Sequence, residues 1–134
     1  MLFRSLLRME RMKHYLSICN AGPSEVLSII ALKARDKILA RIHGLMRHNI
    51  GLLDGFFAEF AERFEWYRPD GGCIVYPRYL GAEGVEQFCS DLVERTGVLL
   101  LPSSIYHSEL GPVPQDRFRI GYGRAHMEKG LAVF

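Results

Sequence analysis

The sequence is poor in cysteine, and this argues against two kinds of site. It has three cysteines in 134 residues, Cys19, Cys73 and Cys89, an odd number at wide spacings. They form no C-x-x-C pair and no cluster with histidine at the spacing of a zinc site. We therefore expect reduced, partly buried thiols in a cytoplasmic protein, with no structural metal.

A large net charge and a long apolar run are also missing. Lysine and arginine number 17 against 15 aspartates and glutamates, a formal charge of +2. This is too small to argue for nucleic acid or an anionic membrane. No apolar run approaches the ~20 residues that span a bilayer. With 49% apolar and 24% charged residues, the chain is typical of an ordinary globular protein that buries a core.

Common catalytic motifs are absent as well. Residues 121–125 (GYGRA) resemble half of a dinucleotide-binding fingerprint but lack its third glycine. No G-x-S-x-G elbow surrounds the serines of the chain. His43 and His48 are five residues apart, whereas two metal ligands on one helix face are four apart. We expect no metal site and no nucleophile–base pair.

The first sixteen residues have two interpretations. Four basic residues alternate there with leucine, phenylalanine and methionine, as in an amphipathic targeting peptide. Glu10 argues against a targeting peptide, and the pattern continues without a break into Tyr15 and Leu16. A surface helix that belongs to the fold is the alternative that we favour.

The first half of the chain is helical in pattern. The pattern of residues 3–14 is that of a helix. Pro23 and Glu25 mark the start of a second helix, since proline suits the first helical position and a carboxylate suits the first turn. Apolar residues then recur at three- and four-residue steps as far as Phe64. Because glycines interrupt this long stripe, we expect a bend or break near residues 47–51.

The second half alternates between strand and helix patterns. The expected elements are strands at 64–68 and 73–76 that form an antiparallel hairpin around a turn at 69–72, a helix at 83–96 with Val85, Phe88, Leu92 and Val93 inward, a strand at 98–101, a loop at 102–115, a strand that contains Arg119, and a helix from residue 126. Gly97 follows the third helix as a usual stop residue. The fold class is therefore α+β in two layers, with a small, mainly antiparallel sheet packed with helices.

Arg119 is the residue that most strongly suggests chemistry. It lies within an apolar strand pattern beside Phe118 and Ile120. A guanidinium in apolar surroundings is costly unless an anion meets it, and its planar donors suit a carboxylate or a phosphate. The alternative is an edge-strand arginine paired with Asp116, Glu109 or a neighbour. Alternation also places Arg117 on the same face, so the pattern alone does not choose between the two arginines.

Four segments, in chain order, resemble motifs of one enzyme family. Residues 15–25 (YLSICNAGPSE) resemble the entry to a long interdomain helix, and residues 66–72 (WYRPDGG) a P-x-G-G hairpin. Residues 97–104 (GVLLLPSS) resemble a strand and loop, with Ser103 where glycine is usual. Arg119 and the next residue align with an R-I strand. Together they resemble the C-terminal small domain of the fold type I pyridoxal-phosphate aminotransferases of class I/II, over roughly residues 12–134.

The resemblance implies a substrate and a set of site residues. Complete members move an amino group between an amino acid and a 2-oxo acid through pyridoxal phosphate, and their strand arginine holds the substrate α-carboxylate. The resemblance thus selects Arg119 over Arg117. It further suggests that Asn20, Ser103, Ser104 and Tyr106 line the pocket. It implies a domain that begins at residue 23, after a helix and junction at 1–22, and a homodimer for complete enzymes.

Other features of that family have no counterpart in this sequence. The chemistry needs a Schiff-base lysine between a serine and a Gly/Arg-rich turn, and none of the lysines has that context. The phosphate-binding turn, the stacking aromatic and the aspartate at the ring nitrogen belong to a large domain. We therefore expect a fragment that lacks this large domain and is inactive alone. The alternatives are a stand-alone binding module and one half of a split aminotransferase.

Overall fold

The computed structural model describes residues 2–17 and 19–134, which form two compact units, Met1–Leu39 and Ala40–Phe134. These two units do not test the domain boundary that the sequence suggests at residue 23, which stays a prediction. Residue 18, within the junction segment, lies outside the described residues. Across the described part of the chain, no helix combines the length and the apolar character that crossing a membrane requires.

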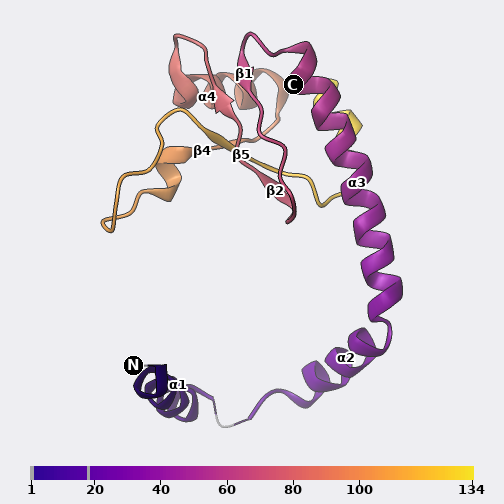
Figure 1. Ribbon diagram of the computed structural model, residues 1–134, viewed down its shortest axis with the longest axis vertical. Helices are drawn as coiled ribbons and strands as arrows, with labels where there is room; N and C mark the ends of the chain where they lie inside the picture. The colour runs from indigo at the N-terminus through magenta and orange to yellow at the C-terminus, as the bar shows by residue number, and fades with distance from the viewer. Residues whose placement is uncertain (1, 18) are drawn as a thin grey trace. The chain divides into compact units, whose positions relative to one another are not determined.

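The first unit consists of helices, drawn in indigo to violet in Figure 1. Helix α1 (Leu2–Leu16) confirms the helix expected at 3–14. Helix α2 (Gly22–Lys33) has its proline at the first helical positions and Glu25 in its first turn, as expected. No residue of α2 is buried, although most of its side chains are apolar.

The break in the long helical stretch was expected at the wrong place. It falls at Ala34, a turn residue between α2 and α3 (Arg35–Glu59). Helix α3 continues without interruption through residues 47–51. Each glycine in a helix costs about 1 kcal/mol relative to alanine, but α3 buries Asn49, Ile50, Leu53 and Phe57 in the second unit. This packing offsets the glycine cost, which local propensity alone cannot reveal.

The strands of the second unit are short. Strand β1 (Phe64–Glu65) pairs antiparallel with β3 (Arg78–Tyr79). Strand β5 (Phe118–Gly121) is the central strand of a three-stranded antiparallel sheet, between β2 (Ile74–Val75) and β4 (Leu101–Pro102) (Figure 1). The sheet is thus mainly antiparallel, as expected.

The hairpin expected between residues 64–68 and 73–76 is wrong. The two segments do form strands, but β1 pairs with β3, and β2 pairs with β5. An alternating pattern predicts which face each side chain takes, but it does not predict which strands pair. Strand β3, which follows the buried Pro77, was not expected from the sequence.

Helix α4 (Gly84–Thr96) covers the strands and confirms the helix expected at 83–96. Val85 and Leu92 are buried and Phe88 is partly buried, as expected, but Cys89 takes the inward place that we gave to Val93. Gly97 ends the helix with φ of 75°, a left-handed conformation that favours glycine. The core also contains an aromatic cluster, in which Tyr79 and Phe88 stack at 4.2 Å between ring centroids.

The remaining elements complete the α+β fold. The loop expected at 102–115 contains a short 3-10 helix, η1 (Ser103–Tyr106). The helix expected from residue 126 is α5 (Met127–Leu131), for which His126 is the N-cap in a left-handed conformation. Helices packed on small antiparallel sheets confirm the predicted fold class.

Candidate functional site

Arg119 lies at the centre of the sheet. Its neighbours in β5, Phe118 and Ile120, point into the core and are 0% and 9% exposed. Arg119 takes the opposite face, is half-buried, and is paired in register with Leu101 of β4. The alternative that placed this arginine on an edge strand is therefore wrong, because β5 has a partner on both sides.

The guanidinium of Arg119 has a neutral partner. Its Nη1 donates a hydrogen bond to the hydroxyl of Tyr106, at 3.2 Å. Tyr106 lies in η1, and its ring makes an edge contact with Tyr76 at 6.4 Å between centroids. Of the carboxylates in the described chain, none forms an ion pair with Arg119. Since a guanidinium carries five N–H donors, most of them stay open to a ligand.

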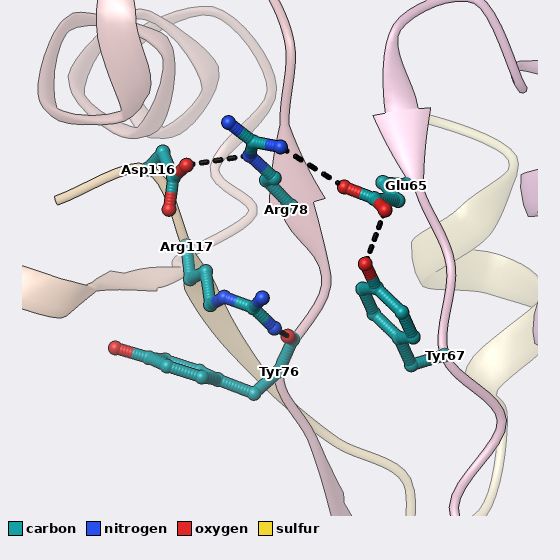
Figure 2. Close-up of polar contacts among 6 residues, drawn as sticks. All are labelled: Glu65, Tyr67, Tyr76, Arg78, Asp116 and Arg117. Carbon is teal, nitrogen blue, oxygen red and sulfur yellow. Dashed lines mark hydrogen bonds and ion pairs between the residues drawn. The ribbon is translucent and has the colours of Figure 1, made fainter. Parts of the chain in front are cut away.

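The carboxylate nearest to Arg119 in the sequence is taken by another arginine (Figure 2). Arg78 Nε donates to Asp116 at 2.5 Å, and Arg78 Nη1 donates to Glu65 at 3.2 Å. Tyr67 also donates its hydroxyl to Glu65. The hydrogen bond from Tyr67 has the larger effect and that from Arg78 the next, and both hold the pKa of Glu65 below its ordinary value. Arg78 thus joins β1 to Asp116, two residues before β5, and Asp116 is not the partner of Arg119.

Arg117 makes different contacts from Arg119. Its Nη1 donates to the carbonyl oxygen of Tyr76 at 3.4 Å, as Figure 2 shows, and its guanidinium lies 5.3 Å from the ring centroid of Tyr67. A guanidinium over an aromatic face is a favourable cation–π contact. These contacts tie Arg117 to the neighbouring chain segments, which makes it the less available of the two arginines.

The other predicted site residues do not gather at one point. Ser103 is fully buried; its backbone N–H donates to the Arg117 carbonyl at 2.8 Å, and its hydroxyl has no partner within the described residues. Ser104 is exposed in η1. Asn20 belongs to the first unit, where its side chain accepts a hydrogen bond from Lys13 at 3.5 Å. The structure therefore brings together Tyr106 and Arg119, and Ser103 is bound to Arg117, the residue before β5.

An apolar pocket lies beside Arg119. It has a volume of about 200 Å³ and is formed by the segment before β4, by β5 and by the C-terminal helix. Besides Arg119, its lining includes Leu99, Met127, Leu131 and Phe134. A cationic group at the border of an apolar pocket can bind a carboxylate that carries an apolar group.

Sequence reasoning missed Asn49. This side chain is 0% exposed, and its Nδ2 donates to the carbonyl oxygens of Tyr122 at 2.8 Å and Arg124 at 2.7 Å. Asn49 thereby fixes the chain that leaves β5 to helix α3. The signal was a polar residue within the apolar stripe of α3, since a buried polar group must find hydrogen-bond partners.

No protein-family profile matches the chain. It is similar to capreomycidine synthase from Streptomyces vinaceus, with 27% identity over 124 residues, 91% of this chain and 30% of that protein. Two solved structures superpose on 92% of the chain. They are a PLP-dependent aminotransferase from Streptococcus suis (TM-score 0.79, 22% identity, 32% of that chain) and the PLP-dependent cyclase OrfR (TM-score 0.77, 23% identity, 33% of that chain).

A third solved structure agrees with these two. It is N-succinyldiaminopimelate aminotransferase from Mycobacterium tuberculosis, with a TM-score of 0.72 and 20% identity over 90% of this chain and 32% of that one. The chain thus spans about a third of the length of the proteins that it matches. At these identities the likeness concerns the fold, and it extends over nearly the whole chain. The resemblance noted from the sequence is confirmed at that level: the chain has the fold of the small C-terminal domain of the fold type I PLP-dependent enzymes.

Proposed function

We propose that this chain is the substrate-binding portion of a pyridoxal-phosphate-dependent enzyme that acts on amino acids, and that Arg119 holds the substrate carboxylate. The complete protein would transfer an amino group between an amino acid and a 2-oxo acid, as a homodimer. The observation that carries the proposal is the environment of Arg119. It is a half-buried cation on a central strand with only a neutral hydroxyl as partner.

Electrostatics favours a carboxylate at this guanidinium. Its charge is not compensated by Asp116, which binds Arg78 instead. A carboxylate can accept two parallel N–H bonds from a guanidinium, which are roughly twice as strong as neutral hydrogen bonds. Tyr106 holds the other side of the guanidinium in place and thereby restricts the direction in which a ligand is bound.

The residues of this chain do not fit the covalent site of the cofactor. Of its lysines, Lys13 is exposed and donates to Ser17 and Asn20, and Lys33, Lys37 and Lys129 are exposed on helices. A lysine that reacts with a carbonyl group is usually desolvated, and all four of these are exposed. We therefore derive no chemical step through pyridoxal phosphate. The role that we assign to this chain is to bind and orient the substrate.

The binding role can be tested on the chain itself. We expect acetate, titrated into chain labelled with ¹⁵N-arginine, to shift the side-chain resonance of Arg119 saturably. The Arg119→Ala variant should lose this response. Arg117→Ala is the matched control, because it removes a guanidinium from the same strand segment while Arg119 remains. A response that survives Arg119→Ala but not Arg117→Ala would assign the carboxylate to Arg117 and overturn the proposal.

The effect on turnover can be measured in a chimera in which this chain replaces the matching third of a PLP-dependent relative. We expect Arg119→Ala to raise KM and to lower kcat/KM by ~10²-fold or more, because a charge-assisted bidentate contact is lost. Arg117→Ala should change kcat/KM much less. Unchanged kinetics in the Arg119 variant would place the carboxylate clamp elsewhere.

One observation favours a second function, in which the chain binds another protein through helix α2. Helix α2 exposes Val26, Leu27, Ile29, Ile30 and Leu32, each more than half exposed. An apolar helix surface of this kind is normally covered by protein. The chain would then act as a stand-alone interaction module, or as one half of a split aminotransferase. Mixing it with a separately produced large domain distinguishes these two, because only the split enzyme regains transamination.

A further inference from the structure

A second pocket lies between helix α3 and the turn that precedes β2. It has a volume of about 330 Å³, and its lining includes His43 and Arg47 of α3, two glycines of the turn, Gly71 and Gly72, and Tyr122 at the end of β5. It shares no lining residue with the pocket beside Arg119. Its volume falls at the lower end of the range for small-ligand sites.

Two arginines, Arg47 and Arg68, bring positive charge to this pocket. His43 and Arg47 are four residues apart, so they project from the same face of α3. Within the described residues, neither forms an ion pair with a carboxylate. Arg68, on the opposite wall, uses one nitrogen to bind Asp54. A guanidinium has five N–H donors, so both arginines keep donors for a ligand.

The turn supplies backbone donors. In the described part of the chain, the N–H groups of Gly71 and Gly72 have no backbone acceptor, and the Gly72 carbonyl accepts a hydrogen bond from the Tyr122 hydroxyl at 2.8 Å. Gly72 has φ of 88°, which favours glycine, and a Cβ on either glycine would meet no atom within 4 Å. Successive free N–H groups in such a turn form a concavity that suits anions.

One carboxylate, that of Asp70, also lines the pocket. Among the lining side chains, two arginines against this aspartate leave one net positive charge with His43 counted as neutral, and Asp54, which binds Arg68 from outside the lining, offsets that charge. A carboxylate repels a fully ionised anion but accepts a hydrogen bond from an anion that still carries a proton. Phosphate near neutral pH carries an O–H group, whereas sulfate does not. The donor and acceptor set therefore suits a protonated phosphate.

We propose that this pocket binds a phosphate group, with Arg47, Arg68 and the glycine N–H groups as donors and with Asp70 accepting the phosphate hydroxyl. The ligand is free inorganic phosphate, because a phosphate monoester has mostly lost this hydroxyl proton near neutral pH. The site does not depend on the role proposed for Arg119, because the two pockets have no residue in common.

The test is a titration of ¹⁵N-labelled chain with inorganic phosphate at constant ionic strength, followed by amide NMR. We expect saturable shifts of Gly71 and Gly72 and no saturable shift at Arg119. Arg47→Gln should weaken binding about tenfold, because a charge-assisted contact is lost. Arg41→Gln is the matched control on the same helix, since Arg41 is exposed and does not line the pocket; it should change the dissociation constant less than about twofold.

Sulfate and a phosphate monoester complete the test. We expect sulfate to bind more weakly than phosphate, and Asp70→Asn to reduce this difference, because an amide does not repel sulfate. We expect O-phosphoethanolamine to bind more weakly than inorganic phosphate at about pH 7, because the monoester is mostly without the hydroxyl that Asp70 accepts, and tighter binding of the monoester would overturn the assignment of Asp70. The proposal fails if Gly71 and Gly72 do not respond in the wild-type chain, if sulfate binds as well as phosphate, or if Arg41→Gln weakens binding as much as Arg47→Gln.

Discussion

Helices α2 and α4 are of nearly equal length, 12 and 13 residues, but they differ in what they bury. Helix α4 has its apolar residues on one face and buries Val85, Cys89 and Leu92 against the strands. Helix α2 has apolar residues on every side and buries none. An amphipathic helix needs one surface to pack on, whereas a helix that is apolar all round needs cover on several sides. The second unit therefore has a core of its own, and the first unit has apolar surface without cover.

The strongest test of this difference is the removal of one large apolar side chain from each unit. Phe57→Ala deletes a side chain that is 1% exposed, and we expect it to lower the free energy of unfolding by about 3–5 kcal/mol, since it leaves a cavity. Ile30→Ala in α2, at 57% exposure, should cost less than about 0.5 kcal/mol. Urea denaturation measures both. A cost for Ile30→Ala close to that for Phe57→Ala would mean that α2 is covered in solution.

The cysteines test the same difference by chemistry. Burial raises the pKa of the Cys89 thiol to about 11, whereas Cys19 of the first unit is exposed. Because the thiolate is the reactive form, we expect iodoacetamide at pH 8 to modify Cys89 at least ~10²-fold more slowly than Cys19. Mass spectrometry of timed digests gives both rates. Equal rates in the native chain would show that the core around α4 is open to solvent.

Two asparagines provide a third comparison. Asn49→Leu removes both donors to the carbonyls of Tyr122 and Arg124, and we expect a loss of about 2 kcal/mol of stability, because buried carbonyls are left unpaired. Asn20→Leu, at an exposed position of the first unit, should cost less than about 0.5 kcal/mol. Thermal unfolding followed by circular dichroism measures both. Should the two variants melt alike, Asn49 would not be the link between α3 and the chain after β5.

The smallest expected effect concerns acid stability. The pKa of Glu65 is lowered from 4.5 by hydrogen bonds from Tyr67 and Arg78, so its carboxylate stabilises the folded state above the unfolded pKa. This contribution is lost as the pH falls through the lowered folded pKa. We expect Glu65→Gln to reduce the pH dependence of unfolding between pH 5 and the acid limit. Unfolding titrations at several pH values decide this, and identical curves for the wild type and Glu65→Gln would contradict it.

The sequence predicted elements better than it predicted contacts. Helix α4, its stop at Gly97 and the strand around Arg119 were expected correctly, since periodicity and glycine geometry are local properties. The pairing of β1 with β3 was not expected, because partners are chosen by packing between distant segments. The break at Ala34 was missed for a similar reason, since buried side chains of α3 outweigh its glycines.

The same limit applies to the candidate site. Arg119 and Tyr106 were both expected there, and the structure joins them by a hydrogen bond. The roles of Arg78 and Asn49 depend on residues 38 and 73 or more positions away in the chain. No pattern within a short window contains such information. Their importance follows only from the folded arrangement.

The hydrogen bond between Tyr106 and Arg119 has a consequence for selectivity. A cation that is held by a neutral phenol can exchange its partner without separating two opposite charges, so an incoming carboxylate does not have to compete with an internal one. Under the function proposed above, Arg119 would not distinguish one substrate from another, because every amino acid and every 2-oxo acid carries a carboxylate. Discrimination among substrates would therefore depend on the residues that contact the substrate side chain, and Arg119 would set the orientation of the substrate.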